Sequence, residues 1–175
     1  MSYGCCLFGH QKVKPSSEPT SIPNIQDEIV ERANEGDGEY CFELSKLLID
    51  NESNPKLGEY YLNKSIDAGF SEAYIYYAQI LFSGKAIQKD DKKAKKYLNL
   101  AVKKNIPIAP SLLAEFYFDT NQPKKGLKIL TKSVKNNNTK SMIYLSNLYQ
   151  DGIIVKRDFK EAIKQLENAY QNGDE

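Results

Sequence analysis

The residues best suited to chemistry are few and lie mostly at the start of this 175-residue chain. The single histidine is His10, and the three cysteines are Cys5, Cys6 and Cys41. A Ser-His-Asp or Cys-His catalytic set, or a His-rich metal site, would therefore have to be built from the N-terminus. The cysteine spacing fits neither a disulfide framework nor a pair of C-x-x-C zinc knuckles. Most hydrolase and metalloenzyme interpretations are weakened, and a reducing compartment is expected.

The adjacent thiols of Cys5 and Cys6 are suited to S-acylation. They are flanked by Leu7 and Phe8 and precede two lysines and a linker rich in Pro and Ser. Two acyl chains would give a stable membrane anchor, whereas one chain gives only marginal binding. N-myristoylation is excluded as a further tether because residue 2 is Ser. The alternatives are two unmodified thiols in a disordered tail, and a metal site that includes His10.

Charged side chains give weaker indications. Glu115 and Asp119 lie four residues apart, but nothing near them in the sequence supplies a base, a metal-ligand set or a Gly-rich phosphate loop. A solvated face or helix capping is the simpler interpretation. A basic cluster could meet an acidic partner or anionic lipid, or be a charged outer face, which is the plainer account: Lys92, Lys93, Lys95, Lys96. The net charge of +1 disfavours a nucleic-acid binder.

The elements that position these residues begin after a tail. Residues 1–23 form a tail and linker, in which Pro and hydroxyl residues between 11 and 23 prevent a long helix. Residues 24–175 have apolar positions at spacings of three and four, which indicates amphipathic helices. No apolar stretch approaches the roughly 18 residues that a membrane span needs. The first ten residues have no charged n-region and only a short apolar segment, so we do not expect them to act as a secretory signal. We expect a cytoplasmic protein, or one on the cytoplasmic face of a membrane.

The helical region is an internal repeat. Copies begin at Tyr40, Ala73, Ala109 and Ser141, at distances of 33, 36 and 32 residues, after a leading half over 24–36. Positions 1, 5, 6 and 9 of each copy form the core arc of its first helix, and position 6 carries a small residue. The predicted helices are 25–34, 38–50, 55–67, 71–83, 90–104, 108–119, 123–135, 139–150 and 158–171.

Two copies also carry clear helix boundaries. Gly84 and Gly152 are expected to end their first helices in the left-handed conformation. Asp90 and Asp158 are expected to cap the helices that follow.

The pattern Ala-x3-Tyr-Ala-x2-Leu-x2-Gly-x2-Ile-x2-Asp-x2-Lys-Ala-x2-Tyr-Leu-x2-Ala from Ala73 resembles the Sel-one-like repeat, a relative of the tetratricopeptide repeat. The copy from Ser141 is similar over the same length, and the other two are degenerate. The resemblance implies an all-α, right-handed α/α superhelix, or solenoid, of about four and a half helix-turn-helix repeats over 24–175. It also implies a non-enzymatic adaptor or scaffold for protein complexes and no cofactor.

A partner would lie on the inner wall of the superhelix. Positions 3, 7 and 10 of each first helix point away from the core arc, and a wall that contains three Phe and three Ile is less polar than a solvated face. We expect a protein or peptide segment to bind the following residues: Phe42, Lys46, Ile75, Gln79, Phe82, Glu115, Phe118, Ile143 and Asn147. The same pattern also assigns Ile49, Ser111 and Gln150 to this wall.

Other interpretations of this wall and of the whole chain stay open. Adjacent first helices could instead touch along part of the wall, so that its apolar residues are inter-repeat packing. For the whole chain, the alternatives are a membrane-tethered scaffold and an enzyme of unknown class.

Overall fold

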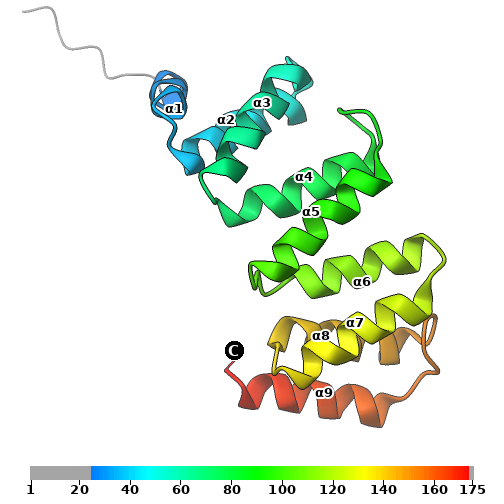
Figure 1. Ribbon diagram of the computed structural model, residues 1–175. Helices are drawn as coiled ribbons and strands as arrows, with labels where there is room; N and C mark the ends of the chain where they lie inside the picture. Colours follow the sequence, from blue (N-terminus) through cyan, green and yellow to red (C-terminus); the bar gives the residue numbers. More distant parts are fainter. Residues whose placement is uncertain (1–24, 174–175) are drawn as a thin grey trace, which may run out of the picture.

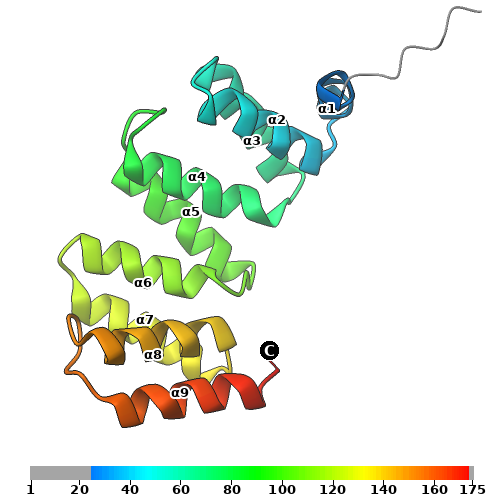
Figure 2. The same cartoon turned by 180° about the vertical axis from the view of Figure 1, so that it is seen from behind.

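The helices stack in sequence order from one end of the molecule to the other (Figures 1 and 2). The computed structural model describes residues 25–173, and every regular element in that range is an α-helix. The helices are α1 Ile25–Asn34, α2 Gly38–Asp50, α3 Pro55–Asp67, α4 Ser71–Ser83, α5 Asp91–Lys103, α6 Ala109–Asp119, α7 Pro123–Lys135, α8 Thr139–Asp151 and α9 Phe159–Gln171. The predicted helices are confirmed, with boundaries that differ by one residue where they differ.

The repeat unit is a pair of packed helices. The pairs α2 and α3, α4 and α5, α6 and α7, and α8 and α9 each pack closely, and each pair contacts the next along the chain. Helix α1 packs on α2 as a leading half repeat. No helix between residues 25 and 173 has both the length and the hydropathy to cross a bilayer.

In two of the pairs, α4 with α5 and α8 with α9, a longer loop joins the two helices, and specific residues cap the helix ends on either side of it. Gly84 and Gly152 end α4 and α8 in the left-handed conformation, with φ of 68° and 70°. The Asp90 carboxylate accepts a hydrogen bond from the Lys93 backbone N at 2.8 Å, and Asp158 accepts one from Glu161 N at 3.0 Å. The predicted capping roles are confirmed, and because the two Asp residues are N-caps, α5 and α9 begin one residue later than predicted.

The other two pairs have a shorter connection and a glycine at the contact between their helices. A Cβ at Gly58 would lie 2.5 Å from Cγ1 of Ile49, and a Cβ at Gly126 would lie 2.5 Å from Cε1 of Phe118. The matching positions in the longer-loop pairs are Ala94 and Ala162. Glycine therefore lets a large side chain at the end of the first helix pack directly on the second helix.

The core of each pair follows the repeat positions. The small residue at position 6 is at most 1% exposed in all four copies: Ser45, Ala78, Ala114 and Ser146. Tyr77 and Leu81 are buried in the largest core cluster, at the middle of the stack. The predicted helix phase is therefore confirmed.

First helices of successive pairs touch one another directly. The Phe42 ring of α2 lies 5.7 Å from the Tyr76 ring of α4, and Phe82 of α4 lies 5.1 Å from Phe116 of α6. Ser111 of α6 and Ser141 of α8 have their hydroxyl oxygens 3.5 Å apart. Because a curved stack brings successive helices closest on its inner side, these contacts place α2, α4, α6 and α8 along the inner wall of the solenoid.

Candidate protein-binding surface

The inner wall contains two hollows. The first, which we call the α4–α6 hollow, has a volume of about 170 Å³. Its lining is largely apolar, with two carboxylates: Ala78, Gln79, Phe82, Leu98, Leu112, Glu115, Phe116 and Asp119. Small-molecule pockets typically have about 300–1,000 Å³, so this space suits a single side chain better than a cofactor.

The second hollow, the α2–α4 hollow, has a volume of about 500 Å³ and is bounded by α2, α4 and the turn before α6. Its lining combines apolar side chains with polar side chains and with charges of both signs: Phe42, Lys46, Ser71, Glu72, Ile75, Tyr76, Gln79, Lys104, Asn105, Ile106, Pro107 and Ile108. Gln79 is exposed and lines both hollows, so the two adjoin along α4.

The α4–α6 hollow is electrostatically acidic. Two causes raise the pKa of Glu115: the larger is partial desolvation by neighbouring side chains, and the smaller is the negative charge of Asp119. Burial and the charges of Glu115 and Asp119 raise the pKa of Tyr144 to about 12, which places this α8 side chain within the field of the two carboxylates. A cation held beside Glu115 would relieve this repulsion.

The α2–α4 hollow has a fixed polar edge. The Tyr76 hydroxyl donates a hydrogen bond to Oδ1 of Asp50 at 2.6 Å, and so joins α4 to α2. Burial, together with this hydrogen bond, raises the pKa of Tyr76 above its ordinary value. The ring is thereby held against Phe42, and the two aromatic groups form one wall of the hollow.

Most of the predicted wall residues come together in these hollows. Phe42, Lys46 and Ile75 line the α2–α4 hollow, and Phe82 and Glu115 line the α4–α6 hollow. Both interpretations of the wall hold for Phe42 and Phe82. Phe42 is buried in the core and Phe82 is half-buried against Phe116, while each also lines a hollow.

The remaining predicted residues have other surroundings. Phe118 is half-buried and packs toward Gly126 of α7, so its ring belongs to the contact within a pair. On α8, Ile143 is half-buried and Asn147 is exposed, and neither lines the two hollows.

The other three residues of the predicted wall also divide into core residues and an exposed residue. Ile49 is 1% exposed and Ser111 is 4% exposed, so both are core residues and not part of an open wall. Gln150 of α8 is exposed.

Sequence reasoning did not include several residues that shape the wall. Tyr76, Leu112 and Tyr144 occupy position 4 of their copies, one residue beyond the predicted position 3. Phe116 occupies position 8, where it packs between first helices, and Asp119 joins Glu115 at the hollow. A broader arc that included positions 4 and 8 would have found the four aromatic and aliphatic residues, whereas Asp119 lies at position 11 of its copy.

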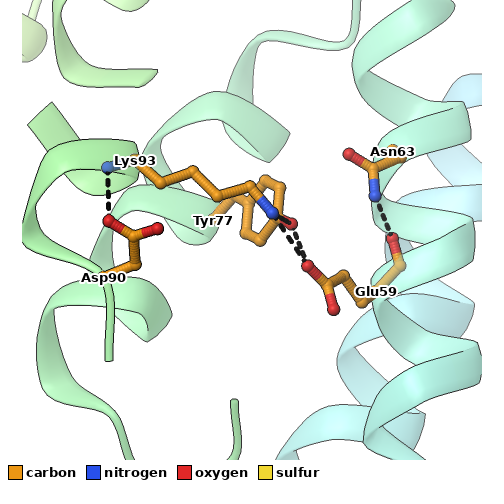
Figure 3. A network of polar contacts seen from close by, with 5 residues as sticks. All are labelled: Glu59, Asn63, Tyr77, Asp90 and Lys93. Carbon is orange, nitrogen blue, oxygen red and sulfur yellow. Dashed lines mark hydrogen bonds and ion pairs between the residues drawn. The ribbon is translucent and has the colours of Figure 1, made fainter. Parts of the chain in front are cut away.

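A second polar group lies away from the inner wall and joins two repeats (Figure 3). The Lys93 Nζ of α5 donates to Oε1 of Glu59 on α3 at 3.0 Å and also contacts the Tyr77 hydroxyl of α4. The Tyr77 hydroxyl in turn hydrogen-bonds to Glu59. We call these residues the Glu59–Tyr77–Lys93 bridge. It corrects the interpretation of Lys93 as one member of a solvated outer face.

The bridge keeps each group in its ordinary charge state near neutral pH. Burial alone would raise the pKa of Glu59, but hydrogen bonds from Tyr77 and Lys93 lower it. Burial and the bond to Glu59 raise the pKa of Tyr77 to about 12. Burial opposes the charge on Lys93, but its two hydrogen bonds raise the pKa overall. A general acid or base needs a pKa near the working pH, so these shifts suit a structural link between repeats.

Of the three cysteines, only Cys41 lies within the residues that the structure describes. Cys5 and Cys6 lie outside the described residues, as does His10. Cys41 is buried, and its Sγ donates to the carbonyl oxygen of Ala33 at 3.3 Å. Burial raises the pKa of its thiol, as for an inert core cysteine. Within residues 25–173, no cluster of three His, Cys, Asp or Glu side chains could hold a metal ion.

Comparison with known families identifies the repeat. The family model of the Sel1 repeat matches residues 36–70, 71–106 and 139–174. The stretch between the second and third matches, 107–138, contains α6 and α7, which nonetheless form the same kind of helix pair. No curated protein sequence matches the chain.

Solved structures share the fold. A Sel1 repeat protein from Oxalobacter formigenes superposes with a TM-score of 0.64 at 20% identity, covering 84% of this chain and 62% of that one. A protective antigen of uropathogenic Escherichia coli gives 0.62 at 18% identity, covering 86% and 34%. A Klebsiella pneumoniae protein described as a Sel1 repeat protein gives 0.54 at 16% identity, covering 83% and 73%. The chain thus spans about a third of the Escherichia coli protein and three fifths of the Oxalobacter protein.

Proposed function

Because this chain belongs to the Sel1 repeat family, we propose that it is a non-enzymatic adaptor whose inner wall binds a segment of a partner protein in the cytoplasm. The observation that carries this function is the α4–α6 hollow, an apolar space for about one side chain with Glu115 and Asp119 in its lining. Interfaces gain most of their affinity from a few such anchor points.

The lining of the hollow defines the chemistry of the segment. Phe82, Phe116 and Leu112 offer an apolar surface, and both charged side chains of the lining are acidic. The segment therefore carries a large apolar residue with Lys or Arg beside it. Its next residues pass Gln79 into the α2–α4 hollow, where Lys46, Lys104 and Glu72 accept a polar sequence of mixed charge.

Selection from a random peptide library on the full chain tests this function. We expect enrichment of Lys or Arg next to Leu, Met or an aromatic residue. Selected peptides should lose affinity for Glu115→Lys, because the change places a like charge opposite the peptide cation. Their affinity should also fall with added salt, and at acidic pH as Glu115 becomes protonated.

Asp67→Lys is the matched control. Asp67 is an exposed carboxylate at the end of α3 and lines neither hollow, yet the substitution changes the net charge equally. Equal loss of binding in both variants would mean that only overall charge matters. Unchanged binding to Glu115→Lys would also contradict the proposed site.

The membrane-tethered scaffold is a separate proposal, supported by the Cys5-Cys6 pair beside Leu7 and Phe8. A double variant, Cys5→Ser with Cys6→Ser, should move from the membrane to the soluble fraction in cells that contain acyltransferases. Hydroxylamine, which cleaves the thioester, should release the parent chain in the same way. Equal soluble fractions for parent and variant would leave an adaptor without this tether.

A further inference from the structure

Helix α9 carries a continuous apolar stripe that faces solvent. Phe159 is 62% exposed, Ile163 57%, Leu166 41% and Tyr170 73%. Their spacing of four, three and four residues places all four on one line along the helix. It is also the spacing of alternating core positions over two heptads of a coiled coil. We call these residues the α9 stripe.

The same face is covered elsewhere in the molecule. The positions of α5 that match Ile163, Leu166 and Tyr170 are Lys95, Leu98 and Val102. Leu98 and Val102 belong to the central core cluster, in which α6 takes part.

Lys95, the third matching position, also contacts α6. Its Nζ lies 5.3 Å from the centre of the Tyr117 ring. In α5, therefore, a neighbouring helix covers the face that α9 presents to water.

We propose that the α9 stripe is covered by α9 of a second copy of this chain, in an antiparallel arrangement with two-fold symmetry. The dyad lies between Ile163 and Leu166, so that each Ile163 faces a Leu166 and each Phe159 faces a Tyr170. Self-pairing of this kind is the commonest way in which soluble proteins form closed oligomers.

Charge complementarity supports the antiparallel direction. Lys160 and Glu167 are both exposed and lie one heptad apart on the same flank of the stripe. A two-fold axis at the centre brings Lys160 of one copy beside Glu167 of the second copy, and the reverse pair forms by symmetry. A parallel pair would instead place these residues opposite Ala162 and Ala169, which are buried and uncharged.

The size of the stripe sets the strength of the association. Four side chains on one helix are much less than the roughly 800 Å² that each partner buries in a standard interface. We therefore expect a reversible dimer with a dissociation constant on the order of micromolar or weaker.

Sedimentation velocity of the full chain over a range of concentrations tests the proposal. The wild type should pass from monomer to dimer, and Ile163→Glu should remain monomeric. Leu57→Glu is the matched control because Leu57 is 41% exposed on α3, away from the stripe, and it should dimerise like the wild type. Circular dichroism melting confirms that both variants are folded.

A charge-reversal pair tests the direction. Lys160→Glu should weaken the dimer by about fivefold, and adding Glu167→Lys in the same chain should restore it. A wild type that is monomeric at every concentration overturns the proposal. If the wild type instead forms open-ended oligomers, and Val30→Glu on α1 abolishes them, the copies stack head to tail. If Glu167→Lys does not restore the affinity lost in Lys160→Glu, the antiparallel arrangement is overturned.

Discussion

The Glu59–Tyr77–Lys93 bridge is the clearest case of single side chains acting across repeats. Its three members come from α3, α4 and α5, and the Glu59 and Lys93 side chains are 31% and 36% exposed. Partial exposure limits the strength of an ion pair, but the shared tyrosine hydroxyl adds hydrogen bonds. We therefore expect the bridge to contribute about 1 kcal/mol to the free energy of unfolding.

The pKa shifts fix the pH range of this contribution. The folded pKa of Glu59 is lowered, so the stabilisation is complete above the ordinary value of 4.5 and is lost as pH falls through the folded pKa. The folded pKa of Tyr77 is raised to about 12, so stability is lost as pH rises above the ordinary value of 10.0. Glu59→Gln should lower the melting temperature near pH 7, and this loss should become smaller as the pH falls below 4.5.

Glu43→Gln provides the comparison, because Glu43 is an exposed carboxylate on α2 outside the bridge. Thermal melts of wild type and both variants from acidic to neutral pH give the measurement. A loss for Glu59→Gln that is the same at every pH would mean that the bridge does not depend on the ionised carboxylate.

Pairing of helices depends on how closely their backbones approach. At Gly126 an added Cβ would lie 2.8 Å from the Ala114 carbonyl oxygen as well as 2.5 Å from the Phe118 ring. Alanine favours a helix over glycine by about 1 kcal/mol, but a backbone oxygen cannot move aside as a side chain can. Gly126→Ala should therefore destabilise the protein by about 1–3 kcal/mol in urea unfolding.

Lys128→Ala on the same helix is the control, since Lys128 is exposed and its substitution removes no packing. If Gly126→Ala is instead more stable than the wild type, α6 and α7 must separate without cost, and the close approach would not be what selects glycine there.

At the scale of the whole molecule, stability is distributed along the stack. The largest core cluster draws on α2 to α7 and centres on α4 and α5, and neither α1 nor α9 contributes to it. Helix α9 packs mainly on α8, and α1 packs mainly on α2, with a hydrogen bond from the Tyr61 hydroxyl of α3 to Asn34. In a solenoid, stability is approximately a sum of repeat and interface contributions, so the ends open more easily than the middle. We expect amide hydrogen exchange to be slowest in α4 and α5 and fastest in α1 and α9.

Mass-spectrometric exchange on dilute protein, where any dimer has dissociated, measures this profile. Uniform protection along the chain would show that the stack opens in one step. Additional protection of α9 at high concentration would agree with the proposed pairing of the α9 stripe.

The helix pairs and their boundaries could be predicted from the order of the residues. Those features depend on local chemistry: the left-handed glycines at 84 and 152, the capping carboxylates at 90 and 158, and the apolar spacing within each helix. Each is decided by a few neighbouring residues, and repetition of the pattern made the signal stronger. Most of the inner-wall residues could also be predicted from the sequence, because helix geometry fixes which positions face away from the core.

Which wall residues stay open depends on how successive repeats pack against one another. Phe42 and Phe82 have the same predicted role as Gln79, yet neighbouring helices bury the first and half-bury the second. Nor do the bridge residues Glu59 and Lys93 recur, because the Ala109 and Ser141 copies carry Leu127 and Glu161 at the matching positions. Side-chain burial depends on the rotation and spacing between repeats, which no single helix specifies, and this geometry is what brings residues 59, 77 and 93 together.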